Sequence, residues 1–234
     1  MEEGRRVVEA AAREGVPLRL LGGVAVRLRC SGPDREFKDL DFATTKKASG
    51  GAQELLRRLG YDPHVGFNAM NARERLLFFD DAHSRQVDVF VGSFRMCHEI
   101  PLEGRIAIDE GTVPLAELLL TKLQIIELNE KDVRDTVVLL AEHDVTDDDS
   151  GVNAARVAEL CAADWGLWRT ITNNFREVAV HLEGYDVDRG RVAQRLERLQ
   201  QRIDAADKSR GWRLRAKVGE RKRWYELPEE VGGV

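Results

Sequence analysis

Apolar and polar residues follow two periodicities along this chain, one typical of helices and the other typical of strands. Over residues 2–14, Val7, Val8 and Ala11 fall on one side of an expected helix. Short apolar runs bounded by turn residues predict strands over residues 17–21, 39–44, 76–79 and 86–91. The turn residues between the last two runs predict a hairpin, which would place Asp88 beside the strand of residues 39–44.

Helical periodicity dominates the second half of the chain. Residues 24–29 fit a strand or a helix, and a helix is favoured because Ser31-Gly32-Pro33-Asp34 is a stop signal. Further helices are expected over residues 51–59, 112–128, 131–143, 152–162, 165–182 and 188–206. The tail is expected to form a small hairpin from residues 212–218 and 224–227, and residues 229–234 are expected to be loose.

These elements predict an α+β fold with a mixed sheet, flanking helices and a helical C-terminal domain. The acidic break at Asp144–Gly151 marks the expected boundary, with a core over residues 1–145 and a helical domain with a basic tail over residues 150–234. The chain has 234 residues, enough for one large domain or a domain and a half.

Several sequence features bear on the cellular location of the protein. No apolar run of about 18 residues is present, so no membrane span is expected. The charged start of the chain lacks the basic-then-apolar layout of a signal peptide. Cys30, Cys97 and Cys161 are far apart and odd in number, which favours reduced, buried thiols. A cytoplasmic location is therefore expected.

Charge is spread unevenly along the chain. The net charge of −5 does not call for a nucleic-acid partner. Residues Arg191 to Arg223, however, carry many more Lys and Arg than Asp and Glu. A solvated helix face is the favoured interpretation of this basic stretch, and RNA binding is the alternative.

The most informative chemistry lies in the run Asp39-Leu40-Asp41-Phe42. Side chains two residues apart on a strand point to the same face, about 6.5–7 Å apart. Two carboxylates so placed suit a hard cation such as Mg²⁺ or Mn²⁺, which shares carboxylate oxygens with substrate phosphates. Solvent-facing acids are the plainer alternative. Gly22-Gly23 before the run and Asp88 after it favour a metal-dependent nucleotide site.

Lys122 lies among leucines in Leu118-Leu119-Leu120-Thr121-Lys122-Leu123. A lysine directed at a triphosphate would explain this position, although most helical lysines are simply solvated. Asp132 and Asp135 on the following helix are better explained as surface charge or as partners that orient Lys122 or Arg134. Sequence patterns of Ser–His hydrolases, P-loop NTPases and Rossmann oxidoreductases are absent.

The order Leu21-Gly22-Gly23, Asp39-Leu40-Asp41-Phe42 and a later strand acid, Asp88, resembles the nucleotidyltransferase superfamily of the DNA polymerase beta type. Within it, residues 15–143 are most similar to the AbiEii-like toxin nucleotidyltransferases of type IV toxin–antitoxin systems. Arg35 matches a basic position of the family, whereas Phe37 stands where many members have a hydroxyl residue.

The resemblance implies transfer of a nucleoside monophosphate from an NTP to a hydroxyl acceptor, either a tRNA end or a small molecule. It implies that Asp39, Asp41 and Asp88 bind metal and act in catalysis with Lys122. Nucleotide binding would involve Gly22, Gly23, Arg27 and Lys122, and an antitoxin protein is an implied partner. The alternatives are a non-catalytic nucleotide- or partner-binding protein on the same fold, and a structural domain in which the three acids do not converge.

Overall fold

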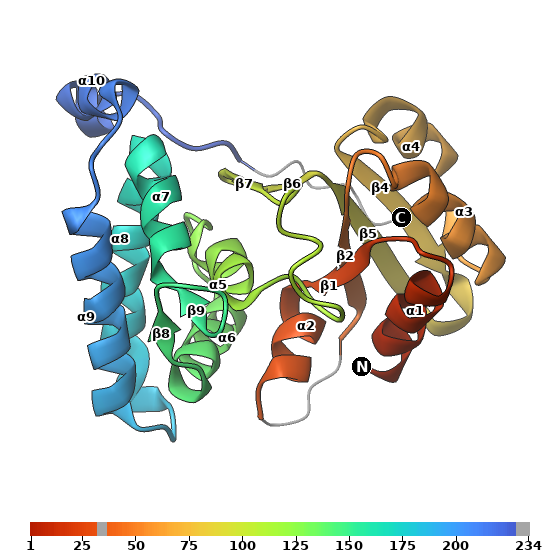
Figure 1. Ribbon diagram of the computed structural model, residues 1–234, viewed down its shortest axis with the longest axis horizontal. Helices are drawn as coiled ribbons and strands as arrows, with labels where there is room; N and C mark the ends of the chain where they lie inside the picture. Colours follow the sequence, from red (N-terminus) through yellow and green to blue (C-terminus); the bar gives the residue numbers. More distant parts are fainter. Residues whose placement is uncertain (32–36, 228–234) are drawn as a thin grey trace. The chain divides into compact units, whose positions relative to one another are not determined.

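The computed structural model describes residues 1–31 and 37–227, which fold into two compact units (Figure 1). The first comprises Met1–Phe94 and Ile100–Leu118, and the second comprises Arg95–Glu99 and Leu119–Val234. The units divide the chain earlier than the expected boundary at residues 145–150. The reason is that helix α6 (Glu130–Glu142) packs on helices α8 (Trp165–His181) and α9 (Arg189–Ala205) of the second unit.

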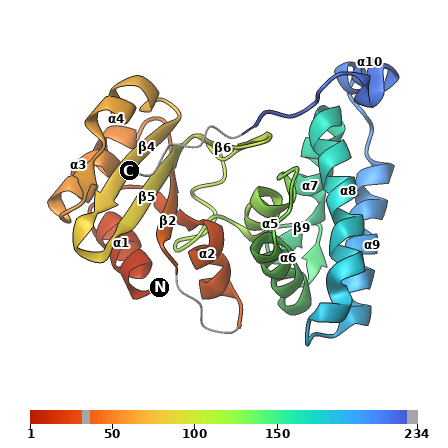
Figure 2. The ribbon, with the colours of Figure 1, turned by 180° about the vertical axis from the view of Figure 1, so that it is seen from behind.

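The first unit is built on a five-stranded mixed sheet in the order β1-β2-β5-β4-β3. Its strands are β1 (Leu18–Leu21), β2 (Asp39–Thr44), β3 (Asp62–Pro63), β4 (Arg75–Asp80) and β5 (Arg85–Val91). β2 runs parallel to β5, and the other neighbouring strands are antiparallel. The neighbours β2, β5 and β4 can be followed from the other side in Figure 2. The predicted mixed sheet is thereby confirmed.

The two faces of this sheet differ in chemistry. Leu40, Phe42, Val87, Val89 and Phe78 alternate onto one face, and each is at most 2% exposed. The residues between them alternate onto the other face, as side chains in strands do. That second face carries the candidate acids.

Helices of the first unit pack on the sheet and on each other: α1 contacts β1 and α3, α2 contacts β1 and β2, and α4 contacts β4. Their bounds are α1 (Glu2–Arg13), α2 (Gly22–Arg29), α3 (Ser49–Arg58) and α4 (Val65–Asn71), with a 3₁₀ turn η1 (Asp81–His83). A two-stranded sheet pairs β6 (Ser93–Arg95) with β7 (Glu99–Pro101). Helix α5 (Leu115–Leu123) runs across the division between the units.

The second unit is mainly helical, as predicted. Its elements are α6 (Glu130–Glu142), β8 (Val145–Thr146), β9 (Val152–Asn153), α7 (Ala154–Ala163), α8 (Trp165–His181), η2 (Leu182–Gly184), α9 (Arg189–Ala205), α10 (Arg210–Val218) and η3 (Gly219–Arg221). Asp164 begins α8 by accepting hydrogen bonds from the backbone of Gly166 at 2.6 Å and Leu167 at 3.2 Å. Such side-chain caps satisfy backbone donors that have no partner within the helix.

Two predicted elements differ from the structure. The hairpin expected over residues 212–218 and 224–227 is wrong, because residues 210–218 form α10. Ser209 caps this helix by accepting a hydrogen bond from Trp212 N, and Gly219 at φ 60° ends it. The helix expected to reach residue 128 ends at Leu123 instead.

Two further expectations concern the cysteines and the chain ends. Cys30, Cys97 and Cys161 are buried and form no disulfide in the described part of the chain. The expectation for residues 229–234 lies outside the described residues. None of the helices within residues 1–31 and 37–227 has the length and apolar character needed to cross a membrane.

A polar contact ties α1 to the segment after α3 and lowers the pKa of a glutamate. Arg6 donates two hydrogen bonds to the carboxylate of Glu3, at 2.8 and 2.7 Å, and the hydroxyl of Tyr61 donates a third. The bonds from Arg6 dominate over partial burial and, with Tyr61, lower the pKa of Glu3 to about 2 from 4.5.

Glu3→Gln is expected to reduce the loss of stability on acidification. A folded-state pKa below the unfolded value gives stability that is present above about pH 4.5 and is lost as the pH falls toward about 2. Urea unfolding of the wild type and the variant, at about pH 6 and about pH 3, measures this difference. The wild-type advantage should be present at the higher pH and shrink at the lower one; an equal advantage at both would contradict the assignment.

Candidate functional site

The sheet register brings two of the predicted acids side by side. Asp41 on β2 is the direct partner of Asp88 on the parallel strand β5, and Asp39 is the partner of Gln86. Neighbouring strands lie about 4.8 Å apart, and directly opposite residues point to the same face. Asp39, Asp41 and Asp88 therefore share one face of the sheet, with Asp39 exposed, Asp41 half-buried and Asp88 buried.

Gly22 lies against the carboxylate of Asp41. A Cβ atom added at Gly22 would lie only 2.1 Å from Asp41 Oδ2, and the residue has a φ of +65°. Gly22 is also the first residue of α2, which begins without a side-chain cap, and Gly23 follows it in the first turn. The predicted order of strand, Gly-Gly and helix is thereby confirmed, and it places the start of the helix at the acid pair.

Gly22→Ala is expected to destabilise the protein more than Gly15→Ala. Both glycines have a positive φ, +65° and +69°, but no atom lies within 4 Å of the Cβ position at Gly15. The control therefore carries the backbone strain, about 1–3 kcal/mol, without the clash. Urea unfolding of both variants should show an additional loss at Gly22; equal losses would mean that Asp41 moves aside without cost.

Asp88 is held by two donors. Arg75 Nε donates to its Oδ1 at 2.8 Å, and Gln86 Nε2 donates to its Oδ2 at 2.8 Å. The Asp88 side chain is 4% exposed, and that of Arg75 is 20% exposed. Arg75 is a functional candidate that the sequence analysis missed. The sequence showed only that Arg75 lies at the start of a predicted strand. The register of β4 on β5 is what places its side chain near Asp88.

The acids fit a divalent metal in part. Within residues 1–31 and 37–227, no group of three or more His, Cys, Asp or Glu side chains is arranged to hold a metal ion. Mg²⁺ commonly binds one or two protein carboxylates and takes its other ligands from water and substrate phosphates. Asp39 and Asp41 could supply one or two such carboxylates. Both oxygens of Asp88 accept hydrogen bonds from protein donors.

Lys122 belongs to the second unit, on α5. Its Nζ lies 3.1 Å from Asp132 Oδ1 and 3.0 Å from Asp135 Oδ2, and its side chain is 13% exposed. Burial alone would lower the pKa of Lys122, but the charges of Asp135 and Asp132 outweigh it and raise that pKa. The interpretation of these two acids as partners that orient Lys122 agrees with these contacts, while a surface role does not, since both are buried.

The remaining residues named from the sequence are Arg27, Arg35 and Phe37. Arg27 is in the last turn of α2, where its Nη1 donates to Cys30 O at 3.0 Å. Arg35 lies outside the described residues, and Phe37 lies just before β2.

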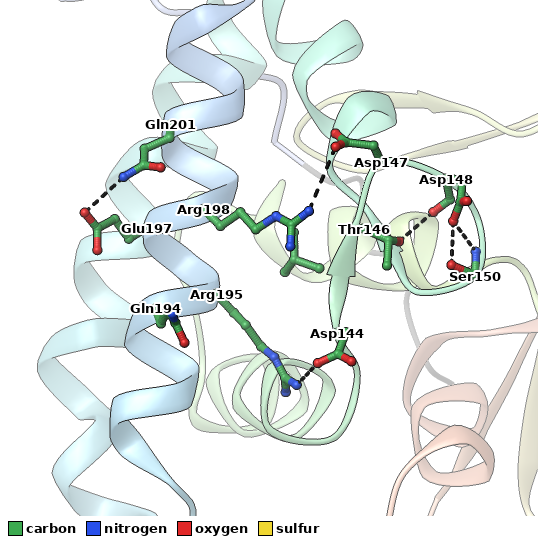
Figure 3. A pocket seen from close by; sticks show the side chains of 11 residues that line it. Asp144, Thr146, Asp147, Asp148, Ser150, Gln194, Arg195, Glu197, Arg198 and Gln201 are labelled. Atoms are coloured by element: carbon green, nitrogen blue, oxygen red, sulfur yellow. Dashed lines mark hydrogen bonds and ion pairs between the residues drawn. The ribbon is translucent and has the colours of Figure 1, made fainter.

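A pocket of about 720 Å³ lies in the second unit, between α9 and the segment that contains β8 (Figure 3). Two of its arginines pair with aspartates: Arg195 with Asp144, and Arg198 with Asp147 at 3.9 Å. Arg195 also donates to the carbonyl groups of Leu140 and Ala141, near the C-terminal end of α6. None of the predicted site residues lines this pocket, and its ion pairs hold elements of the unit together.

The basic stretch Arg191–Arg223 spans α9 and α10. Two of its arginines form ion pairs within the second unit: Arg195 pairs with Asp144, and Arg202 pairs with Asp147. Arg215 lies over the Trp165 ring at 4.6 Å. Binding of RNA by this stretch stays a prediction.

Comparisons with known proteins give no independent assignment. No family model matches the chain, and no curated protein matches it either.

Proposed function

We propose that the protein is a metal-dependent nucleotidyltransferase that moves an NMP group from an NTP to a hydroxyl acceptor. The observation that carries the proposal is the register of β2 on β5, which puts Asp41 beside Asp88 on the face that also holds Asp39. The close approach of Gly22 to Asp41 adds the start of a helix at the same place.

Each residue has a role in this proposal. Asp39 and Asp41 would hold a divalent cation, Mg²⁺ or Mn²⁺, which when bound would offset the negative charge of the triphosphate. The first turn of α2, at Gly22 and Gly23, would direct backbone N–H groups and the positive end of the helix dipole toward phosphate. Lys122, whose pKa is raised by the charges of Asp135 and Asp132, would be the further phosphate-binding cation that the resemblance implies.

In the proposed reaction, the acceptor oxygen forms a bond to the α-phosphorus while the bond to pyrophosphate breaks. The acceptor proton passes to a base, for which the carboxylates on the sheet face are candidates. The acceptor is a tRNA end or a small hydroxyl compound. An antitoxin-like protein partner and a cytoplasmic location complete the proposal.

The test is to incubate the protein with Mg²⁺ and each labelled NTP in turn, with total RNA in one series and a panel of hydroxyl compounds in another. Transfer of label to one acceptor with stoichiometric pyrophosphate release is the expected result. Absence of release with every NTP and acceptor would refute the proposal.

A second candidate is a non-catalytic protein that binds a nucleotide on the same face. The pairing of Asp88 with Arg75 and Gln86 favours it, because this acid already has two protein donors. Nucleotide binding in calorimetry without any turnover would distinguish this candidate from the enzyme.

A further inference from the structure

Arg75 stands on the same sheet face as the three acids. It is the direct partner of Phe90, and Asp88 lies two residues before Phe90 on β5. Side chains two residues apart on a strand share a face, and directly opposite residues do so as well. The order of charged side chains across the sheet is therefore Asp41 on β2, Asp88 on β5 and Arg75 on β4.

The guanidinium of Arg75 is held by contacts on several sides. Its Nε donates to Asp88 Oδ1 at 2.8 Å, and its central carbon lies 5.2 Å from the ring centre of Phe90 and 5.9 Å from that of Phe67. Stacking on aromatic rings and pairing with a carboxylate both restrict the orientation of an arginine. The side chain is thus ordered before any ligand binds.

The Nη1 and Nη2 atoms of this guanidinium are available as hydrogen-bond donors. In the described part of the chain, Arg75 makes its hydrogen bond through Nε, and neither Nη1 nor Nη2 has a hydrogen-bond partner. These two nitrogens carry four N–H groups in a fixed planar arrangement. Such a fork matches two oxygens of one phosphate group, and the 20% exposure of the side chain leaves it accessible.

We propose that Arg75 binds a phosphate group of the nucleotide, and that Asp88 is a positioning residue that orients Arg75. This inference rests on the proposed function for the identity of the ligand. It gives the sheet face two kinds of group: Asp39 and Asp41 for a cation, and Arg75 for the anionic phosphate.

The two hydrogen bonds at Asp88 support this division. A buried carboxylate that accepts from Arg75 and Gln86 is compensated by the protein itself, so its charge needs no further cation. Direct binding of metal by Asp88 would compete with a charge-assisted bond, which is the stronger kind of hydrogen bond.

The test measures binding of inorganic tripolyphosphate and of a non-hydrolysable NTP analogue by calorimetry. Arg75→Gln is expected to weaken both affinities about ten- to a hundredfold, since it removes a bidentate, charged donor. Arg75→Lys keeps the charge without the fork and should also bind more weakly than the wild type; it gives the answer if the glutamine variant fails to fold.

Arg85→Gln is the matched control. The Arg85 side chain is also 20% exposed and pairs with an aspartate, Asp80, at 3.5 Å. Arg85 alternates onto the opposite face of β5 from Asp88, so its removal should leave both affinities within about twofold of the wild type. Unchanged binding in folded Arg75 variants, or an equal loss in the control, would overturn the proposal, as would a wild-type protein that does not bind tripolyphosphate.

Asp88→Asn separates positioning from metal binding. The variant should weaken tripolyphosphate binding while leaving Mn²⁺ affinity, measured by electron paramagnetic resonance, unchanged. A loss of Mn²⁺ affinity would make Asp88 a ligand and overturn its assigned role. Turnover that survives in Arg75→Gln with unchanged binding would refute this inference alone, whereas Arg75-dependent binding without turnover in the wild type would refute the proposed function alone.

Discussion

Asp41→Asn is expected to lower Mg²⁺-dependent NTP turnover by a factor of about a hundred to a thousand. The variant keeps the shape of the side chain, so Gly22 and the register of β2 should be undisturbed. It removes one of the two carboxylate charges that would share the cation with Asp39. The rate of pyrophosphate release at several Mg²⁺ concentrations measures the effect, and Asp39→Asn should behave in the same way.

Asp62→Asn is the control for this experiment. Asp62 is an exposed aspartate on β3 of the same sheet, at the opposite edge from β1. The control should retain turnover, and melting temperatures should show that all variants fold. Retention of full turnover and Mg²⁺ dependence in Asp39→Asn and Asp41→Asn would rule out the proposed metal site.

The apolar pattern predicted those elements whose burial alternates clearly. β2 begins and ends at Asp39 and Thr44, as expected, because Leu40 and Phe42 must lie on the buried face. The turn between β4 and β5 made a hairpin predictable, and the hairpin was enough to place Asp88 next to β2. Local pattern therefore gave both the face of the sheet and the neighbour of the acid pair.

The apolar pattern could not predict contacts between side chains from separate strands. The role of Arg75 follows from its bond to Asp88, which depends on the β4–β5 register and on the aromatic rings around the guanidinium. The hairpin predicted for the tail was wrong. The Ser209 cap and packing of α10 on α7 and α8 stabilise a helix there instead.

The nucleotide site, as predicted from sequence, combined residues of both units. Asp39, Asp41 and Asp88 lie in the first unit, and Lys122 lies in the second. The ammonium group of Lys122 forms ion pairs with Asp132 and Asp135. Its positive charge is therefore compensated by carboxylates of the second unit. Phosphate binding by Arg75 would supply a cation within the first unit, on the same face as the acids.

Arg105→Ala is expected to cost about 3–5 kcal/mol of the free energy of unfolding, because it leaves a buried carboxylate without its cation. Arg105 binds Glu117 through two hydrogen bonds, from Nε at 2.6 Å and from Nη2 at 3.1 Å. The Glu117 side chain is fully buried, and that of Arg105 is 15% exposed. Urea unfolding of the variant and the wild type measures the loss.

Two comparisons make this prediction specific to the buried pair. Arg58→Ala removes an ion pair with Glu14 whose side chains are 54% and 43% exposed, so its loss should stay within about 1 kcal/mol. The double variant Arg105→Met/Glu117→Leu removes both charges together and should recover much of the loss, because apolar replacement of a buried pair is often close to neutral. A loss of stability in Arg105→Ala no larger than that in Arg58→Ala would contradict the prediction. It would show that rearranged contacts of α5 give the carboxylate of Glu117 another compensating donor.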